Sequence, residues 1–134
     1  MYQLLIADDK YEIRNGLSSY FPWEQVGFEV ACLAQNGQEV LERVESQHID
    51  AILCDIQMPI MTGIEVAREL HRRKSPISIV FLSGYREFEY AQQALEYGVK
   101  NYILKPTKFN ELQHVFGKLQ EELDRKRDHA SLLS

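Results

Sequence analysis

Four short apolar runs constrain the fold of this chain most strongly, because polar residues follow each of them at once. The runs cover residues 4–7, 51–54, 79–82 and 102–104, and the polar residues that follow them are Asp8, Asp9, Asp55, Ser83 and Lys105. An unbroken apolar run is typical of a strand that is covered on both faces, as in parallel sheets. The carboxyl ends of parallel strands meet at one edge, so the pattern predicts that these polar side chains gather there.

Helix-like segments lie between the apolar runs. The pattern predicts strands over residues 3–7, 29–34, 51–54, 77–82 and 101–104, and helices over residues 11–20, 38–47, 64–73, 87–97 and from 109 onward. Prolines at positions 22, 76 and 106 and the glycine at 98 separate several of these elements, because they interrupt a helix or favour its end. Strands that alternate with helices indicate βαβ units, so we expect an α/β fold with one parallel sheet between two layers of helices.

Length and composition favour one globular domain and exclude several classes of function. The 134 residues are 45% hydrophobic, which is enough for one core. The formal charge of −5 gives no general reason to bind nucleic acid or an anionic membrane. No apolar run approaches the roughly 20 residues of a membrane span, and the strand-like start shows no signal peptide. Cys32 and Cys54 lie in apolar runs, so we expect buried, reduced thiols in a cytoplasmic protein.

Three carboxylates at the predicted edge favour a site for a hard cation. Asp8, Asp9 and Asp55 would repel one another in a dry pocket. Mg²⁺ suits a few carboxylates together with water and phosphate oxygens. The alternative is that Asp8 and Asp9 only cap the helix that follows, although capping and metal binding are compatible.

Asp55 is the best candidate for a reactive carboxylate, because it follows the most continuously apolar run and should be rigidly held. A carboxylate can attack a phosphoryl group to give an acyl phosphate, and a shared metal ion would neutralise charge in the transition state. Lys105 offers a point charge for another phosphoryl oxygen; the alternative is a surface lysine paired with one of the acids. Pro106 stiffens the loop, and the Lys-Pro bond is a candidate for the cis form.

Four further residues give weaker signals. The hydroxyl of Ser83 can donate to a phosphoryl oxygen, although a serine at a strand end is more often a turn residue. Gly84 leaves space for an incoming group, and Gly63 favours a tight loop before the next helix. Tyr102 could swing inward when Ser83 moves toward a phosphate; by spacing alone it is an ordinary strand aromatic.

Taken together, these residues resemble the receiver domain of two-component response regulators. The similarity runs from residue 1 to about residue 122 and rests on Asp8-Asp9, Asp55-Ile56-Gln57-Met58-Pro59 with Gly63, Ser83-Gly84 and Lys105-Pro106. The resemblance implies a flavodoxin-like three-layer sandwich, in which a five-stranded parallel sheet of order 2-1-3-4-5 is covered by five helices. We therefore expect a receiver domain over residues 1–122 and a charged helical extension over residues 123–134.

The resemblance also implies a role for each site residue. Asp55 would accept a phosphoryl group from a phosphohistidine on a sensor histidine kinase. Asp9, Asp55 and the backbone carbonyl of Gln57 would bind Mg²⁺ directly, and Asp8 would act mainly through water. Ser83 and Lys105 would contact the phosphoryl group, and Tyr102 would be the switch aromatic. The domain would not be an enzyme beyond catalysing its own phosphotransfer and dephosphorylation.

Two stretches are similar to receivers joined to AraC-type DNA-binding domains, namely Phe21-Pro22-Trp23 and the segment from Leu82 to Ala91. No helix-turn-helix module fits after the last helix, so we expect a receiver cut from a longer regulator or a stand-alone receiver. The charged tail favours the first. The resemblance implies a homodimer through the fourth helix, fifth strand and fifth helix, without direct contact of this domain with nucleic acid or membrane.

The sequence departs from the commoner receiver pattern at two positions, and two other functions fit the same fold. Lys10 stands where many relatives have glutamate, and Ser83 stands where threonine is frequent. A phosphorylation-independent interaction module would usually lack an acid or the lysine, whereas all of them are present here. A metal-dependent phosphatase or phosphotransferase for small molecules would need a cap or a substrate loop, and no insertion is long enough.

Overall fold

The computed structural model describes residues 1–84, 88–99 and 101–133, and in these ranges strands alternate with helices. The strands are β1 (Tyr2–Ala7), β2 (Phe28–Ala34), β3 (Ala51–Asp55), β4 (Ser78–Ser83) and β5 (Asn101–Leu104). The helices are α1 (Tyr11–Tyr20), α2 (Gly37–Ser46), α3 (Gly63–Arg72), α4 (Phe88–Ala94) and α5 (Phe109–Leu133), with 3-10 helices η1 (Trp23–Val26) and η3 (Leu95–Tyr97).

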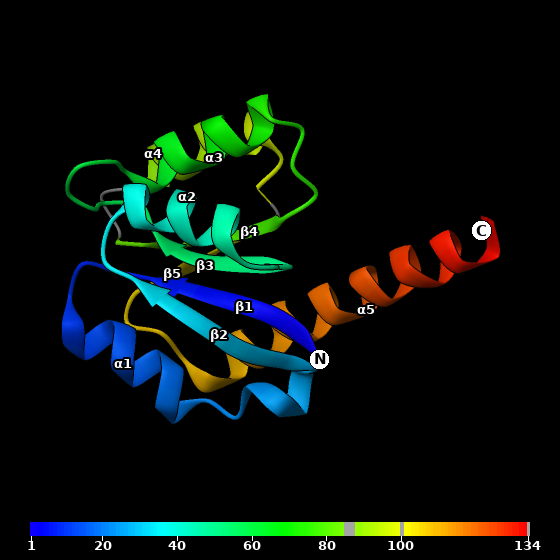
Figure 1. Cartoon of the computed structure of the whole chain (residues 1–134). Coiled ribbons are helices and arrows are strands. Elements are labelled where there is room, and N and C mark those ends of the chain that lie inside the picture. Colours follow the sequence, from blue (N-terminus) through cyan, green and yellow to red (C-terminus); the bar gives the residue numbers. More distant parts are fainter. Residues whose placement is uncertain (85–87, 100, 134) are drawn as a thin grey trace.

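All five strands form one parallel sheet in the order β2-β1-β3-β4-β5. Helices α1 and α5 cover one face of this sheet, and α2, α3 and α4 cover the other (Figure 1). The three layers and the strand order confirm the predicted fold. Because β1 and β3 are neighbours, with Ala7 opposite Cys54, the residues at their carboxyl ends are brought together.

Each central strand supplies side chains to two separate apolar cores. In β1, Leu4 and Ile6 face the core under α1 and α5, whereas Leu5 and Ala7 belong to the core under α2, α3 and α4. All four are fully buried, as expected for a strand with no polar face. Burial of a leucine or isoleucine side chain contributes about 1.5–3 kcal/mol, so β1 and its neighbour β3 are rigid supports for the residues that follow them.

Helices α2 and α3 begin at the carboxyl edge of the sheet with side-chain caps. Asn36 Oδ1 accepts the N–H of Glu39 at 2.9 Å, and Thr62 Oγ1 accepts the N–H of Glu65 at 3.2 Å. Such caps satisfy N–H groups that have no partner within the helix, and each contributes about 1 kcal/mol. They define where the loops at this edge end.

Several predicted boundaries needed small corrections. Strand β3 includes Asp55, and β4 begins at Ser78 and includes Ser83, because their backbone groups still pair with neighbouring strands. The helix predicted over residues 87–97 changes to 3-10 geometry after Ala94 and ends at Gly98, which has a φ of 75°. Residue 87 lies outside the described residues, as do Tyr85 and Arg86 of the AraC-like stretch.

Both cysteines are free, as predicted, but only Cys54 is buried, whereas Cys32 is half-buried. In the described part of the chain, no helix combines the length and the apolar character that a membrane crossing requires.

Candidate functional site

Three carboxylates meet at the carboxyl edge of the sheet. Asp8 follows β1 directly, and Asp55 is the last residue of the adjacent strand β3. Together with Asp9, they offer one carboxylate oxygen each, and these three oxygens lie within 4.8 Å of one another. Asp8 is fully buried and Asp55 is 3% exposed, whereas Asp9 is exposed. The predicted convergence of the three acids is therefore present in the structure.

Lys105 brings a positive charge to this cluster from the end of β5. Its Nζ lies 3.2 Å from Asp8 Oδ2 and 3.2 Å from Asp55 Oδ2. The backbone N–H of Lys105 donates to the carbonyl of Ser83 at 2.9 Å, and the peptide bond from Lys105 to Pro106 is cis. The half-buried ammonium of Lys105 therefore pairs with two acids rather than one, and its contact with a phosphoryl group stays a prediction.

Burial and charge shift the proton affinities at this site. Burial raises the pKa of Asp55 to about 6, helped by the charge of Asp8 and opposed by Lys105 and the N–H of Gln57. Burial disfavours the charged form of Lys105, but Asp55 and Asp8 outweigh it and raise the pKa of this lysine. A like charge in a poorly solvated position disfavours a second ionised carboxyl, so the cluster is short of positive charge.

The two oxygens of Asp8 have different partners. Oδ1 accepts the N–H of Lys10 at 2.9 Å, and Lys10 is the residue that precedes α1 and caps it without a side-chain hydrogen bond. Oδ2 is buried with no hydrogen-bond partner, and it faces Lys105 as an ion pair. Asp8 thus supports the start of α1 with one oxygen and leaves the other for the pocket. A buried, under-satisfied carboxylate oxygen beside two further carboxylates fits the oxygen ligands that Mg²⁺ takes.

The loop after Asp55 is held close to this residue by backbone contacts. The N–H of Gln57 donates to Asp55 Oδ1 at 3.3 Å, and the N–H of Gly63 donates to the carbonyl of Ile56 at 2.9 Å. A Cβ at Gly63 would lie 2.5 Å from the carbonyl oxygen of Asp55, which explains why a glycine opens α3. The Pro59 carbonyl accepts the N–H of Met61 within the same loop.

Ser83 and Tyr102 occupy less direct positions. Ser83 is fully buried at the end of β4, and its hydroxyl donates to the carbonyl of Gly84 at 2.9 Å. The half-buried ring of Tyr102 packs against the core under α2, α3 and α4, opposite Phe81 of β4. Their roles in phosphoryl contact and switching stay predictions.

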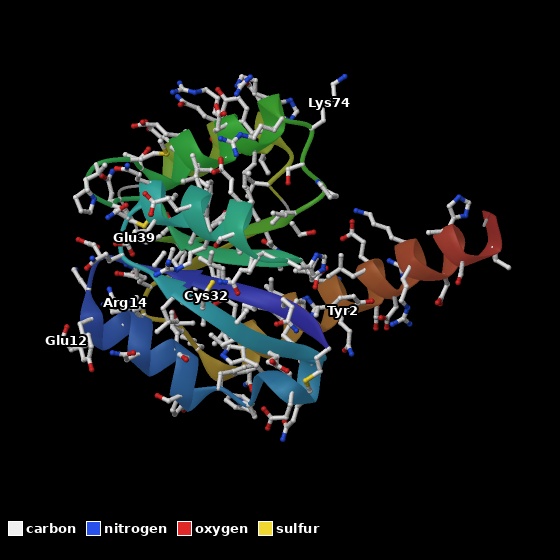
Figure 2. The ribbon with its side chains drawn as sticks, viewed as in Figure 1. Tyr2, Glu12, Arg14, Cys32, Glu39 and Lys74 are labelled. Carbon is white, nitrogen blue, oxygen red and sulfur yellow. The ribbon has the colours of Figure 1, made fainter. Side chains whose placement is uncertain are left out.

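Two features of the site were not predicted from the sequence. Arg14 of α1, labelled in Figure 2, donates to the carbonyl of Asp8 at 2.8 Å and brings a second cation to this edge. Gly37 donates its N–H to the carbonyl of Met61 at 2.9 Å, and a Cβ at Gly37 would overlap that oxygen. Neither contact has a local sequence signal, because each joins elements whose spacing only the folded chain defines.

Comparison with known proteins identifies the family. Residues 4–116 match the family described as "Response regulator receiver domain". The chain belongs to the response-regulator receiver family. This confirms the resemblance seen in the sequence.

Solved structures and curated proteins agree with this assignment. The REC domain of AraT, a response regulator from Geobacillus stearothermophilus, superposes with a TM-score of 0.87 at 35% identity, over 94% of this chain and 98% of that one.

Among curated proteins, the uncharacterized transcriptional regulatory protein YesN of Bacillus subtilis (strain 168) is 37% identical over 132 residues. The match covers 96% of this chain and 35% of YesN. Transcriptional regulatory protein HptR of Staphylococcus aureus (strain NCTC 8325 / PS 47) is 28% identical, with coverage of 92% and 48%. This receiver chain therefore spans half or less of the length of these relatives, and the AraC-type output stays a prediction.

Proposed function

We propose that this receiver domain is the phosphoacceptor of a two-component response regulator and that Asp55 is the phosphorylated residue. One observation carries the proposal: Asp55 is buried at the end of β3 between a second carboxylate and the ammonium of Lys105. Such an arrangement has little value for stability alone, because a buried like-charged pair is costly. It suits a reaction that brings in a phosphoryl group.

In the proposed reaction, an Asp55 oxygen attacks the phosphorus of a phosphohistidine on a sensor histidine kinase. The new O–P bond forms as the P–N bond breaks, and the electron pair of that bond returns to the histidine nitrogen. Asp55 must be ionised to attack, and Lys105 favours the ionised form. The same ammonium can then pair with a phosphoryl oxygen as a point charge.

The residues present would hold Mg²⁺ directly through the carboxylates of Asp9 and Asp55 and the backbone carbonyl of Gln57, and Asp8 would act mainly through water. The bound ion supplies positive charge that offsets the phosphoryl oxygens as they approach the acids. Ser83 would turn its hydroxyl from the Gly84 carbonyl to a phosphoryl oxygen, and Tyr102 would follow it inward. The same groups would later support hydrolysis of the acyl phosphate.

Phosphorylation would then alter the surface formed by α4, β5 and α5. A phosphoryl group adds roughly −1.5 to −2 charges and new acceptor oxygens, which can bias a two-state element. This face would support a homodimer or control an output domain, of which an AraC-type DNA-binding domain is our proposal. Residues 1–122 would be the receiver and residues 123–134 the link to that output, in a cytoplasmic regulator.

Intact mass after incubation with Mg²⁺ and a small-molecule phosphodonor tests the proposal. We expect one added phosphoryl group on the natural sequence and none on Asp55→Asn. Asp50→Asn is the matched control, because Asp50 directly precedes the same strand at the opposite edge of the sheet, and this variant should be phosphorylated normally. Phosphorylation of Asp55→Asn would contradict the assignment of the nucleophile. If the protein of natural sequence is folded but neither gains a phosphoryl group nor binds Mg²⁺, the result would instead favour a phosphorylation-independent module.

A further inference from the structure

Helix α5 continues well beyond the body of the domain. Its buried residues end at Leu119, and Leu123 and Asp124 are half-buried. Every described residue from 125 to 132 is exposed. Figure 1 shows this last part of α5 passing the N-terminus and projecting away from the sheet. Since residues 125–132 are exposed, the direction of this part depends mainly on the last contacts that α5 makes with the body.

The first of these contacts joins strand β1 to helix α5. The hydroxyl of Tyr2, the first residue of β1, donates to Asp124 Oδ1 at 2.5 Å, and Figure 2 shows Tyr2 beside α5. The ring of Tyr2 packs against the ring of Phe28, with 5.8 Å between the ring centroids. Phe28 in turn contacts Phe116 of α5 at 5.3 Å. The donor is therefore held in place by the same core that holds the helix.

A second contact lies beside the first. Gly27 has a φ of 81° at the end of η1, and its carbonyl accepts the N–H of Tyr2 at 2.9 Å. A Cβ at Gly27 would overlap the side chain of Gln120, one turn of α5 before Asp124. The side chain of Gln120 therefore packs directly against Gly27, in the space that a Cβ would occupy, and the positive φ of Gly27 favours glycine there.

The surroundings of the Tyr2 hydroxyl keep it protonated, so that it can donate to Asp124. Burial, followed by the hydrogen bond and the charge of Asp124, raises the pKa of Tyr2 to about 12, so the phenol remains a donor at neutral pH. Arg127 lies one turn further along α5, with Nη2 3.6 Å from Asp124 Oδ1, and partly balances the carboxylate.

We propose that Tyr2, Gly27 and Asp124 form a clamp that fixes the direction in which the last part of α5 leaves the domain. The proposal concerns the geometry of the domain itself and does not depend on phosphorylation of Asp55. In a longer protein, whatever followed α5 would inherit this direction. The alternative is that packing of Leu119 and Leu123 alone aligns the helix.

Residual dipolar couplings of backbone amides in the unmodified chain test the clamp, because they report the orientation of each N–H relative to the whole domain. We expect the couplings of residues 125–132 to fit the alignment of the sheet. In Tyr2→Phe, which keeps the ring on Phe28 and removes only the hydroxyl, these couplings should fall by a factor of about two or more, as local order at the helix end is lost. The couplings of β1 to β5 should be unchanged.

Two further variants separate the clamp from a general loss of stability. Asp124→Ala removes the acceptor and should reproduce the Tyr2→Phe result, and the double variant should add nothing to either single change. Tyr20→Phe removes the hydroxyl of an exposed tyrosine on α1 and should leave the couplings as they are. Couplings of residues 125–132 that are already averaged in the natural sequence, or that survive both Tyr2→Phe and Asp124→Ala, would overturn the proposal.

Discussion

Two aspartates flank strand β3, because Asp50 comes directly before it and Asp55 is its last residue, and the surroundings of the two carboxylates differ. At the amino end, Asp50 Oδ2 accepts the N–H of Gln3 at 2.7 Å, and Oδ1 lies 2.9 Å from His48 Nε2. At the carboxyl end, Asp55 shares its pocket with the buried carboxylate of Asp8 and has a pKa raised to about 6. Both residues are held by the same strand, so the strand itself is not what distinguishes them.

The difference lies in burial and in the neighbouring charge, because both Asp50 and Asp55 have a partner on each oxygen. Asp50 has a partner on each oxygen and closes the amino edge of the sheet as a structural residue. Asp55 and Asp8 share one ammonium and repel each other, so they retain an attraction for a cation or a proton. A carboxylate buried beside a second carboxylate costs stability and has a raised pKa, whereas a carboxylate without such a neighbour can stabilise the fold. Three measurements test this contrast.

The largest effect should follow removal of the cation from the carboxyl edge. Lys105→Ala leaves two buried carboxylates without their ammonium, and the free energy of unfolding should fall by about 3 kcal/mol in Mg²⁺-free buffer. Added Mg²⁺ should restore more stability to this variant than it adds to the natural sequence. Urea denaturation with and without Mg²⁺ measures both changes. Lys108→Ala, at an exposed lysine nearby, is the control, and a loss no greater than that of the control would contradict the prediction.

A somewhat smaller effect should appear when pH is lowered in Mg²⁺-free buffer. The pKa of Asp55 is about 6 in the folded protein against an ordinary value of 3.8, so between these values the folded state binds the extra proton. Its stability should therefore rise as pH falls from 7 to 4, by up to about 3 kcal/mol from this residue.

Asp55→Asn isolates this contribution, because asparagine does not titrate. The stability advantage of Asp55→Asn over the natural sequence should be greatest at pH 7 and should shrink toward pH 4. Denaturation curves at several pH values measure it. An advantage that does not vary with pH would show that Asp55 titrates normally.

The smallest effect should come from Asp50. Asp50→Ala leaves the N–H of Gln3 without its side-chain acceptor and should cost about 1–2 kcal/mol. His48 is exposed, so the loss of its ion pair should contribute little. Because this edge has no need of a cation, the loss should be the same with and without Mg²⁺. A cost that Mg²⁺ reverses would remove the contrast between the two ends of β3.

The sequence predicted the features that depend on short-range pattern. Unbroken apolar runs predicted β1, β3 and β4, and the rule for parallel sheets predicted that Asp8, Asp55 and Lys105 lie together. Boundaries shifted by one or two residues, because backbone pairing extends past the apolar run, as at Asp55 and Ser83.

Features that depend on long-range approach were not predicted. The Tyr2–Asp124 hydrogen bond joins residues 122 positions apart, and no local pattern marks either partner. The different partners of the two Asp8 oxygens were also not predicted, since a sequence shows a carboxylate but not which of its oxygens accepts a hydrogen bond. Asp8 Oδ1 accepts the N–H of Lys10, the residue before α1, rather than an N–H within the helix, and Oδ2 faces Lys105.

The loop after Asp55 is fastened by backbone atoms at Gly37 and Ile56 rather than by its own side chains. Ile60 of this loop is 74% exposed and has a φ of 69°, so its side chain projects from a shape that other contacts maintain. The side chain of Ile60 can therefore be exchanged without loss of the backbone contacts that hold this loop beside Asp55. The constraint lies instead at two glycines: a Cβ at Gly37 would overlap the carbonyl oxygen of Met61, and a Cβ at Gly63 would lie 2.5 Å from the carbonyl oxygen of Asp55.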